Sequence, residues 1–140
     1  MTDVPRPPRR RTLVRPWREA TYASLDFEAT GLDVGRDDVV SFGVVPVITG
    51  RVIVGRRRYQ EVSPTVPLTA RTIVVHGLRP VDVADAPSIA EARDLLRAAI
   101  DGHVVLAWAA EVEAGFLSST FGGSARRWLR RCVDVLGLAV

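Results

Sequence analysis

The sequence predicts an α/β domain built on a mixed β-sheet with flanking helices, and three features of its 140 residues support that class. Strand-like segments surround the tight turn Thr49–Gly50, as in an antiparallel meander. A helix with a clear start signal follows at Ser88. The continuous apolar run HVVLA after that helix is typical of a strand buried on both faces. A crossover helix leading into such a strand favours a mixed sheet.

The strands of the predicted meander can be placed in order. Residues 22–27 form the first strand, and the Gly- and Asp-rich stretch 33–38 (DVGRDD) is a turn. Residues 39–48 and 51–62 are the second and third strands. Pro46 lies inside the second strand, which predicts an irregularity or an edge-facing position there.

The second half of the chain begins with a long connection, residues 63–86, that contains the triplet HGL at 76–78. Ser88 and Glu91 then form a capping box for a helix that continues with apolar residues at helical spacing to Ile100 and stops at Gly102. Residues 103–107 are the buried strand, and residues 110–119 are a second helix that FGGS ends. Residues 125–138 fit either a helix or a strand with helical flanks.

Composition is that of an ordinary globular protein, with 47% hydrophobic and 25% charged residues. No apolar run approaches the ~20 residues of a membrane span, and the Arg- and Pro-rich N-terminus has no apolar signal core. We therefore expect no membrane partner and a cytoplasmic location. The single cysteine, Cys132, is interpreted as a structural thiol, because it has no partner for an internal disulfide.

Basic charge is concentrated at the start of the chain, and all 19 basic residues are arginine. Residues 1–20 carry six Arg against two acids, a net charge of +4, so residues 21–140 sum to about −1. With its prolines, the segment 1–20 is predicted to be a basic disordered arm, and 21–140 the folded domain. The arm either adds non-specific affinity for phosphate backbones or acts as a solubilising tail.

Two carboxylates lie one residue apart in the segment SLDFEATGL, at Asp26 and Glu28. Alternate side chains of a strand point to the same face, so these two share a face while Phe27 points away. Like charges at roughly 6–7 Å repel and lose hydration when a strand is buried, unless a cation lies between them. The pair therefore predicts a divalent metal site; the alternative is a solvated pair at a strand end.

The stretch DFEATGL resembles the first motif of the DEDD-type 3′–5′ exonucleases, where Asp-x-Glu-Thr/Ala-Thr-Gly-Leu is typical. These ribonuclease-H-like proteins include the proofreading subunit of bacterial DNA polymerase III. The hairpin at 49–50, the V-x-P at 62–64, the HGL at 76–78 and the A-P-S at 86–88 follow in the family's order. The resemblance covers roughly residues 16–140 and implies a ribonuclease-H-like mixed sheet.

The resemblance also implies a two-metal site for Mg²⁺ or Mn²⁺, in which Asp26 bridges the ions and Glu28 binds one of them. The segment after the strand is implied to hold the terminal nucleotide.

The implied substrate-binding residues are Ala29, Thr30, Gly31, Leu32 and His76. The first four would offer backbone N–H groups and an apolar wedge, with Gly31 permitting close approach. For Thr30 and His76, simple turn-forming roles remain alternatives.

The second motif departs from the family pattern. It usually reads His-Asn-x-x-Phe-Asp-x-x-Phe-Leu, and here the matching stretch is WAAEVEAGFL at 108–117. Trp108 and Ala109 replace the His and Asn, and Glu113 takes the place of the metal-binding Asp, with its carboxylate about 1.5 Å further out. The alternative is that Glu111 and Glu113 are exposed acids near a helix N-terminus.

The third motif of the family, His-x₃₋₄-Asp on a helix, has no counterpart before Val140. The final segment CVDVLGLAV resembles the stretch that normally precedes it, so the domain is expected to be C-terminally incomplete: either the sequence is truncated or full catalysis is lost. His76 and His103 are not placed to substitute, and His103 is expected to be structural.

The leading hypothesis is a metal-dependent 3′–5′ exonuclease acting on single-stranded DNA or RNA 3′ ends. One alternative is a catalytically inactive relative that binds nucleic acid. Another is a module that contacts a DNA polymerase or other replication protein through its apolar hairpin face. The sequence does not distinguish DNA from RNA as the substrate.

Overall fold

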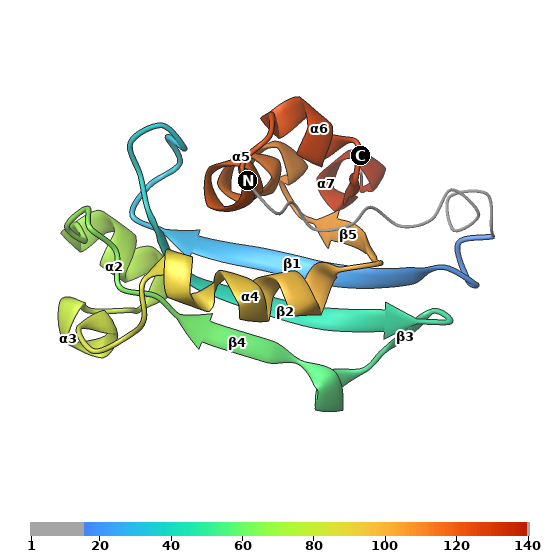
Figure 1. Cartoon of the computed structure of the whole chain (residues 1–140), viewed down its shortest axis with the longest axis horizontal. Helices are drawn as coiled ribbons and strands as arrows, with labels where there is room; N and C mark the ends of the chain where they lie inside the picture. The colour runs from blue at the N-terminus through green and yellow to red at the C-terminus, as the bar shows by residue number, and fades with distance from the viewer. Residues whose placement is uncertain (1–15, 140) are drawn as a thin grey trace.

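A computed structural model describes residues 16–139, which form one mixed β-sheet with helices packed on it (Figure 1). The strands are β1 (Thr21–Ala29), β2 (Val39–Ile48), β3 (Arg51–Val52), β4 (Arg58–Glu61), β5 (Val104–Ala107) and β6 (Cys132–Asp134). The helices are the 3₁₀ turn η1 (Val54–Arg56), α2 (Ala70–His76), α3 (Pro80–Val83), α4 (Ile89–Ile100), α5 (Ala110–Phe121), α6 (Ala125–Leu129) and α7 (Val135–Leu138). The strand order is β3-β2-β1-β5-β6, and β4 also pairs with β2.

The sheet combines the two pairing modes that the sequence predicts. β1 runs antiparallel to β2 and parallel to β5, and β6 is parallel to β5. Thr49 and Gly50 have φ values of 50° and 73° in the predicted turn between β2 and β3, a backbone conformation that glycine adopts without strain. The mixed sheet is therefore confirmed.

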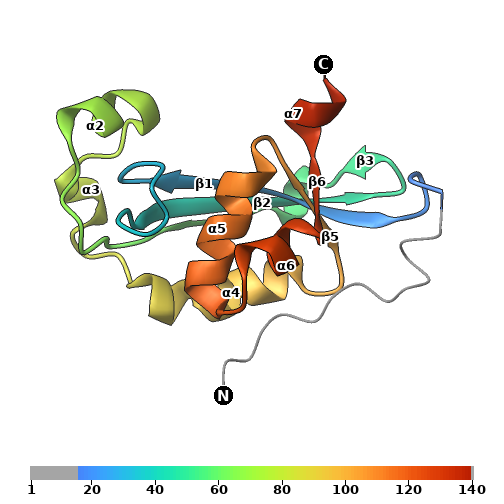
Figure 2. The ribbon, with the colours of Figure 1, turned by 90° about the horizontal axis from the view of Figure 1, so that it is seen from above.

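One face of the sheet carries the hydrophobic core. Leu25 and Phe27 of β1 are buried there with Leu96 of α4 and Phe116 of α5. The rings of Phe27 and Phe116 lie 5.9 Å apart between centroids. Figure 2 shows α4 and α6 on one side of the sheet and α7 on the other. The alternate side chains of β1 point to the face opposite this core, where Asp26 is exposed.

The helix signals read from the sequence hold in the structure. The Ser88 hydroxyl accepts from the Glu91 N–H (3.3 Å), and the Glu91 carboxylate accepts from the Ser88 N–H (2.7 Å), completing the capping box of α4. Gly102 has a φ of 76° just beyond the helix. α5 extends two residues past its expected end, and residues 125–138 form a strand with helical flanks, the second of the two alternatives.

Two expectations were wrong. The third strand is not continuous: β3 and β4 are separated by η1, because β2 exchanges one partner for the other around Pro46, which has no N–H to donate. The connection 63–86 is not free of helix, since it contains α2 and α3. α2 buries none of its residues, so it has no apolar face for a periodicity search to find.

Several remaining expectations can be compared with the described residues. Residues 1–15 of the expected arm lie outside them; the following residues form a turn in which the Glu19 N–H donates to the Pro16 carbonyl at 2.8 Å. Cys132 is a half-buried free thiol whose pKa burial raises to about 11. His103 contacts the Asp101 carbonyl through Nδ1 at 2.9 Å. Within residues 16–139, no helix has the length and apolar character to cross a bilayer.

Candidate active site

Asp26 and Glu28 lie on the same face near the end of β1. Their register partners in β2 are Gly43 and Ser41, and Phe27 between them points into the core. Burial raises the pKa of Asp26. Burial also raises the pKa of Glu28, as does the negative charge of Asp26, while His76 lowers it. The two carboxylates therefore face the same side and repel each other, as the sequence predicts.

Glu113 joins this pair from the first turn of α5. Its side chain is buried, with 6% of the residue exposed, so its interpretation as an exposed helix-end acid is wrong; Glu111 is exposed. Burial raises the pKa of Glu113 to about 8, and the charges of Asp26 and Glu28 add to this rise while a hydrogen bond with the Phe27 backbone opposes it. Its Oε2 is buried and has no hydrogen-bond partner within the described residues.

The turn after β1 is held together by Thr30. The β1–β2 register shifts between Glu28 and Ala29, and the next residue, Thr30, is turned inward and only 5% exposed. Its hydroxyl donates to Asp37 Oδ1 (3.0 Å) and accepts from the Asp38 N–H (2.9 Å). The Thr30 hydroxyl is thus engaged inside the turn.

Gly31 makes room for a carboxylate from its own turn. A Cβ at this position would lie 2.6 Å from Asp37 Cγ, closer than real Cβ atoms approach. Asp37 Oδ2 also accepts from the Asp33 N–H at 2.9 Å. The requirement for glycine therefore has a cause within the fold, independent of any ligand.

Asp38 ties this turn to the connection that leads to α2. Its Oδ2 accepts hydrogen bonds from the Thr65 N–H (2.7 Å), the Thr65 hydroxyl (2.6 Å) and the Val66 N–H (2.9 Å). Burial alone would raise the pKa of Asp38, but these hydrogen bonds hold it below its usual value. Sequence reasoning placed Asp38 in a turn and missed this contact, which spans 27 residues.

A cleft of about 530 Å³ lies between the end of β1 and α2. Its walls include six of the predicted site residues, Glu28, Ala29, Thr30, Gly31, Leu32 and His76. Leu32, the implied apolar wedge, is 79% exposed. Asp26 and Glu113 do not line the cleft, although the charge of Asp26 acts on Glu28 and the charges of Asp26 and Glu28 act on Glu113.

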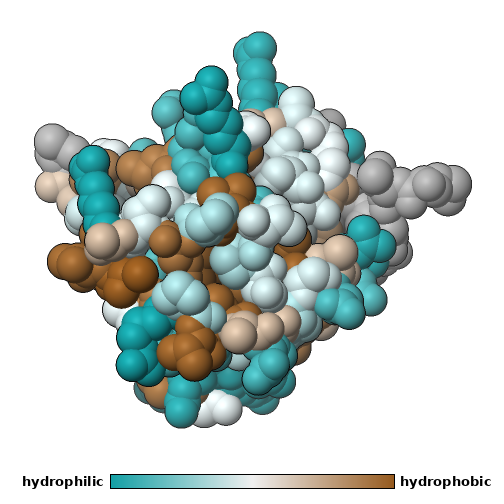
Figure 3. All heavy atoms as spheres, turned by 90° about the vertical axis from the view of Figure 1, so that its left-hand side faces the viewer, coloured by the Kyte–Doolittle hydropathy of each residue, from teal (hydrophilic) through white to brown (hydrophobic). Residues whose placement is uncertain are grey.

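The opposite wall of the cleft comes from α2, which the sequence reasoning missed. Thr69, Arg71, Thr72 and Val75 line it. The only available signal was the pair Thr69 and Thr72, whose side chains form the capping box of α2. Figure 3 shows this end of the molecule, where hydrophobic surface is interrupted by hydrophilic side chains; Val75 is 78% exposed here.

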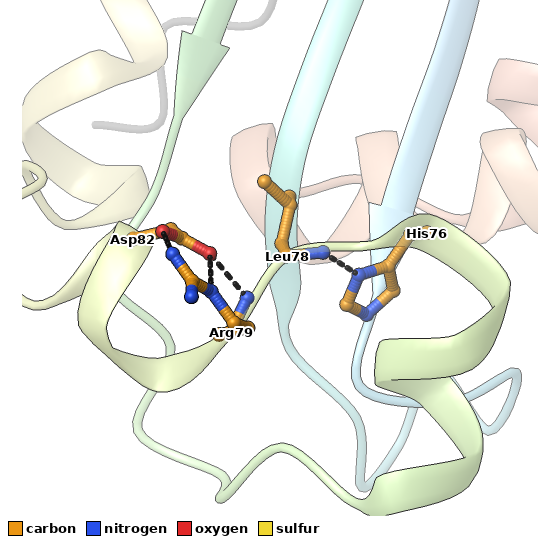
Figure 4. A network of polar contacts seen from close by, with 4 residues as sticks. All are labelled: His76, Leu78, Arg79 and Asp82. Atoms are coloured by element: carbon orange, nitrogen blue, oxygen red, sulfur yellow. Dashed lines mark hydrogen bonds and ion pairs between the residues drawn. The ribbon is translucent and has the colours of Figure 1, made fainter.

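His76 ends α2 and faces the cleft while its ring holds the following turn (Figure 4). Nδ1 accepts from the Leu78 N–H at 3.0 Å, which leaves the proton of a neutral ring on Nε2. Nε2 is buried and has no partner among the described residues. In the next turn, Arg79 binds Asp82 through Nε (2.9 Å) and Nη2 (2.8 Å), which fixes the start of α3. His76 thus stabilises the turn after α2 and also lines the cleft.

The donor chemistry of Asp26, Glu28 and Glu113 suits a hard divalent cation, because Asp26 raises the pKa of Glu28, both raise that of Glu113, and positive charge relieves this repulsion. The buried, unpaired Oε2 of Glu113 is a free ligand atom. Within residues 16–139, however, no three acidic, His or Cys side chains converge closely enough to form a complete site. The residues fit a cation in chemistry without being arranged around one.

Solved structures identify the class of fold. The zinc-bound complex of E. coli exonuclease I with single-stranded DNA matches 86% of this chain and 29% of its own at a TM-score of 0.70 and 15% identity. Exonuclease X in complex with 5′-overhanging duplex DNA matches 68% of this chain and 52% of its own at a TM-score of 0.58 and 22% identity. The mixed sheet with its helices is therefore the ribonuclease-H-like exonuclease fold.

The chain belongs to the exonuclease family, because the family model described as "Exonuclease" matches residues 24–132. A DNA polymerase III subunit epsilon-like protein of Rhodobacter capsulatus is 33% identical over 103 residues, which is 73% of this chain and 15% of that protein. A PolC-type DNA polymerase III of Thermotoga petrophila is 24% identical over 127 residues, 88% of this chain and 9% of that protein. The chain thus spans a small part of these relatives, and the resemblance to DEDD exonucleases is confirmed.

Proposed function

We propose that this domain is a metal-dependent 3′–5′ exonuclease that acts on single-stranded ends of nucleic acid. The observation that carries this proposal is the grouping of Asp26, Glu28 and Glu113: three charge-coupled carboxylates, one of them buried, beside a cleft. A buried acid with a strongly raised pKa, as Glu113 is, costs stability, so a fold that keeps it favours a role in binding or chemistry.

Asp26, Glu28 and Glu113 would hold Mg²⁺ or Mn²⁺. When bound, such ions acidify an attacking water and stabilise charge on the leaving 3′-oxygen. The zinc-bound exonuclease I neighbour supports a metal requirement in this fold. The proposed reaction adds the water oxygen to phosphorus, breaks the P–O3′ bond and releases a nucleoside monophosphate.

The cleft beside these acids would take the terminal nucleotide. The backbone of residues 29–31 and the exposed Leu32 form one wall, and His76 and Arg71 stand on the other. The single-stranded and overhanging DNA in the neighbours' complexes supports a strand end as the ligand.

The test is Mn²⁺-dependent cleavage of single-stranded oligonucleotides by the whole chain, with 5′ labels to read the direction of digestion. We expect a ladder that shortens from the 3′ end and disappears with Asp26→Asn and with EDTA. Asp94→Asn, an exposed acid of α4 with an 81% exposed side chain, is the matched control. Cleavage by Asp26→Asn at the wild-type rate would remove that residue from the site.

The altered second motif, with Trp108 and Ala109 in place of His and Asn, favours a second candidate: an inactive module that binds nucleic acid or a polymerase. The names of the relatives support a polymerase association. A wild-type chain that binds oligonucleotides in Mn²⁺ but leaves them intact would favour this candidate over the exonuclease.

A further inference from the structure

A groove of about 210 Å³ lies at the opposite end of the sheet from the cleft. β2 pairs with β4 over residues 41–44 and with β3 at residues 47–48. Between them, the Ile53 N–H donates to the Pro46 carbonyl at 2.9 Å, and η1 turns outward. The groove runs between this part of β2 and α4, with an aliphatic floor that includes Pro46, Ile48 and Leu95.

Arginines crowd the rim of this groove. Arg56 and Arg58 line it, and Arg51 and Arg57 are their neighbours in β3 and after η1; we call these four the arginine ridge. All four are exposed. His103 lines the groove as well.

The ridge has no carboxylate paired with it in the described part of the chain. Among residues 16–139, none of its four guanidinium groups forms an ion pair with a carboxylate. Arg57 Nη1 donates to the Val54 carbonyl at 3.4 Å, and Arg58 Nη1 donates to the Arg57 carbonyl at 3.1 Å. These backbone contacts orient the groups and leave their positive charge uncompensated, which favours a polyanionic partner.

We propose that the arginine ridge is a second nucleic-acid contact, which binds the phosphates of the strand upstream of the end held in the cleft. This inference rests on the proposed function. The cleft end of the sheet carries the acids Asp26, Glu28 and Glu113, which repel a phosphate backbone when no cation is bound, so basic groups elsewhere on the surface would add to the attraction for the strand.

The separation of the two sites suits one strand. Arg58 pairs with Val44, which pairs with Leu25, three residues before Glu28. At about 3.3 Å per residue and about 4.8 Å per strand, the Arg58 backbone lies roughly 14 Å from that of Glu28. Arg58 shares the core face with Val44, whereas Glu28 points to the opposite face, so a strand that reaches both sites passes around the sheet edge at β4. Single-strand sites span about 4–16 nucleotides, so one oligonucleotide can reach both.

Exposed aromatic residues accompany the ridge. Tyr59 follows Arg58 in β4, is 57% exposed and lies on the other face of the sheet, where it pairs with Gly43, the register partner of Asp26. Trp17 is 59% exposed, lies within 3.8 Å of the Cβ position of Gly50 in the β2–β3 turn, and carries Arg18 over its ring at 4.4 Å. The Trp17 ring beside the Arg18 guanidinium, and the exposed Tyr59 ring on the face of Asp26, are surfaces on which bases of a single strand can stack. They favour nucleic acid over an acidic peptide, which the aliphatic floor would otherwise also accept.

The experiment measures binding of a fluorescein-labelled single strand of about 12 nucleotides by anisotropy in EDTA, so that cleavage plays no part. The variant is Arg56→Ala/Arg58→Ala. The matched control is Arg126→Ala/Arg130→Ala, in α6 and at its C-cap, which removes the same charge. We expect the ridge variant to bind about tenfold more weakly and to lose about 1.4 from the salt slope, about 0.7 for each phosphate contact. The control should change neither value, and Arg56→Lys/Arg58→Lys should keep most of the affinity.

Three results would overturn the proposal. The first is that both alanine pairs weaken oligonucleotide binding equally, and the second is that the ridge variant keeps the wild-type salt slope. The third is that the chain binds hexaglutamate through the ridge and does not bind the oligonucleotide. Cleavage in Mn²⁺ separates this proposal from the exonuclease itself. If the chain binds through the ridge but cleaves nothing, the exonuclease fails and the ridge stands. If the ridge variant binds and cleaves the 12-nucleotide strand as the wild type does, the ridge fails and the exonuclease stands.

Discussion

The two ends of the sheet differ in how they treat charge. At the end where β1 finishes, Asp37 and Asp38 accept hydrogen bonds from Thr30, Asp33 and Thr65 and hold the loops together. At the β2–β3 hairpin end, Arg57 and Arg58 of the arginine ridge donate to backbone carbonyls, and no ridge arginine pairs with a carboxylate among residues 16–139. The aspartates at the first end are hydrogen-bonded within the fold, whereas the arginines at the second end are exposed to solvent and to a partner.

The cleft end contains two kinds of acid, and the contrast between them is instructive. Asp38 has three donors and a lowered pKa, so it works as a structural ligand for the loop. Asp26, Glu28 and Glu113 have raised pKa values instead, and Glu113 keeps an unpaired buried oxygen. Acids whose raised pKa values are not offset by hydrogen bonds are the ones that favour a bound cation.

The largest effect is expected from Asp26→Asn. The substitution keeps the shape of the side chain and removes its charge, so the loss should fall on catalysis. Metal ions supply several kcal/mol of transition-state stabilisation, so the Mn²⁺-dependent rate should fall on the order of 10³-fold. Initial rates on a labelled single strand measure this, with thermal unfolding as the check on folding. A similar fall in Asp94→Asn would assign the effect to general charge.

The pH dependence of stability tests the unpaired acids next. The folded pKa of Glu113, about 8, lies above its ordinary value of 4.5, so the metal-free folded state holds a proton that the unfolded chain has lost between these values. The contribution of Glu113 to the free energy of unfolding should therefore be fully present below pH 4.5. It should fall as pH rises toward 8, by at most about 1.4 kcal/mol per pH unit. Urea unfolding in EDTA from pH 5 to 8 measures it, and Glu113→Gln should flatten the slope while Glu111→Gln should not.

Asp38→Ala tests the paired acids. It removes the acceptor of three hydrogen bonds to Thr65 and Val66, and we expect a loss of about 2–4 kcal/mol in the free energy of unfolding. Because the folded pKa of Asp38 is lowered, the wild type should lose this contribution as pH falls below about 4. Urea titration of the variant beside Asp94→Ala measures it; equal midpoints would show that the Asp38 cross-link contributes nothing.

A pair of glycine substitutions compares the two ends directly. Gly31→Ala would place its Cβ 2.6 Å from Asp37 Cγ, whereas Gly55→Ala in η1 meets nothing within 4 Å. We expect Gly31→Ala to cost about 1–3 kcal/mol and Gly55→Ala to change little. Thermal unfolding of both variants decides; a neutral Gly31→Ala would mean that the turn relaxes without loss.

Much of the fold could be read locally. The hairpin at Thr49–Gly50 and the capping box of Ser88 and Glu91 depend on neighbours a few residues away, so the sequence predicts them. The sequence did not predict α2, because its valines are exposed and form no apolar stripe at helical spacing. The cleft wall that includes Arg71 belongs to α2, so it was not predicted either.

The sequence by itself determined which face of β1 bears Asp26 and Glu28, because strand geometry alternates side chains whatever surrounds them. Only the tertiary structure decided that Glu113 is buried beside them and that Asp38 cross-links a loop 27 residues away. Burial and charge coupling depend on what packs around a group, and residues distant in the chain supply those neighbours.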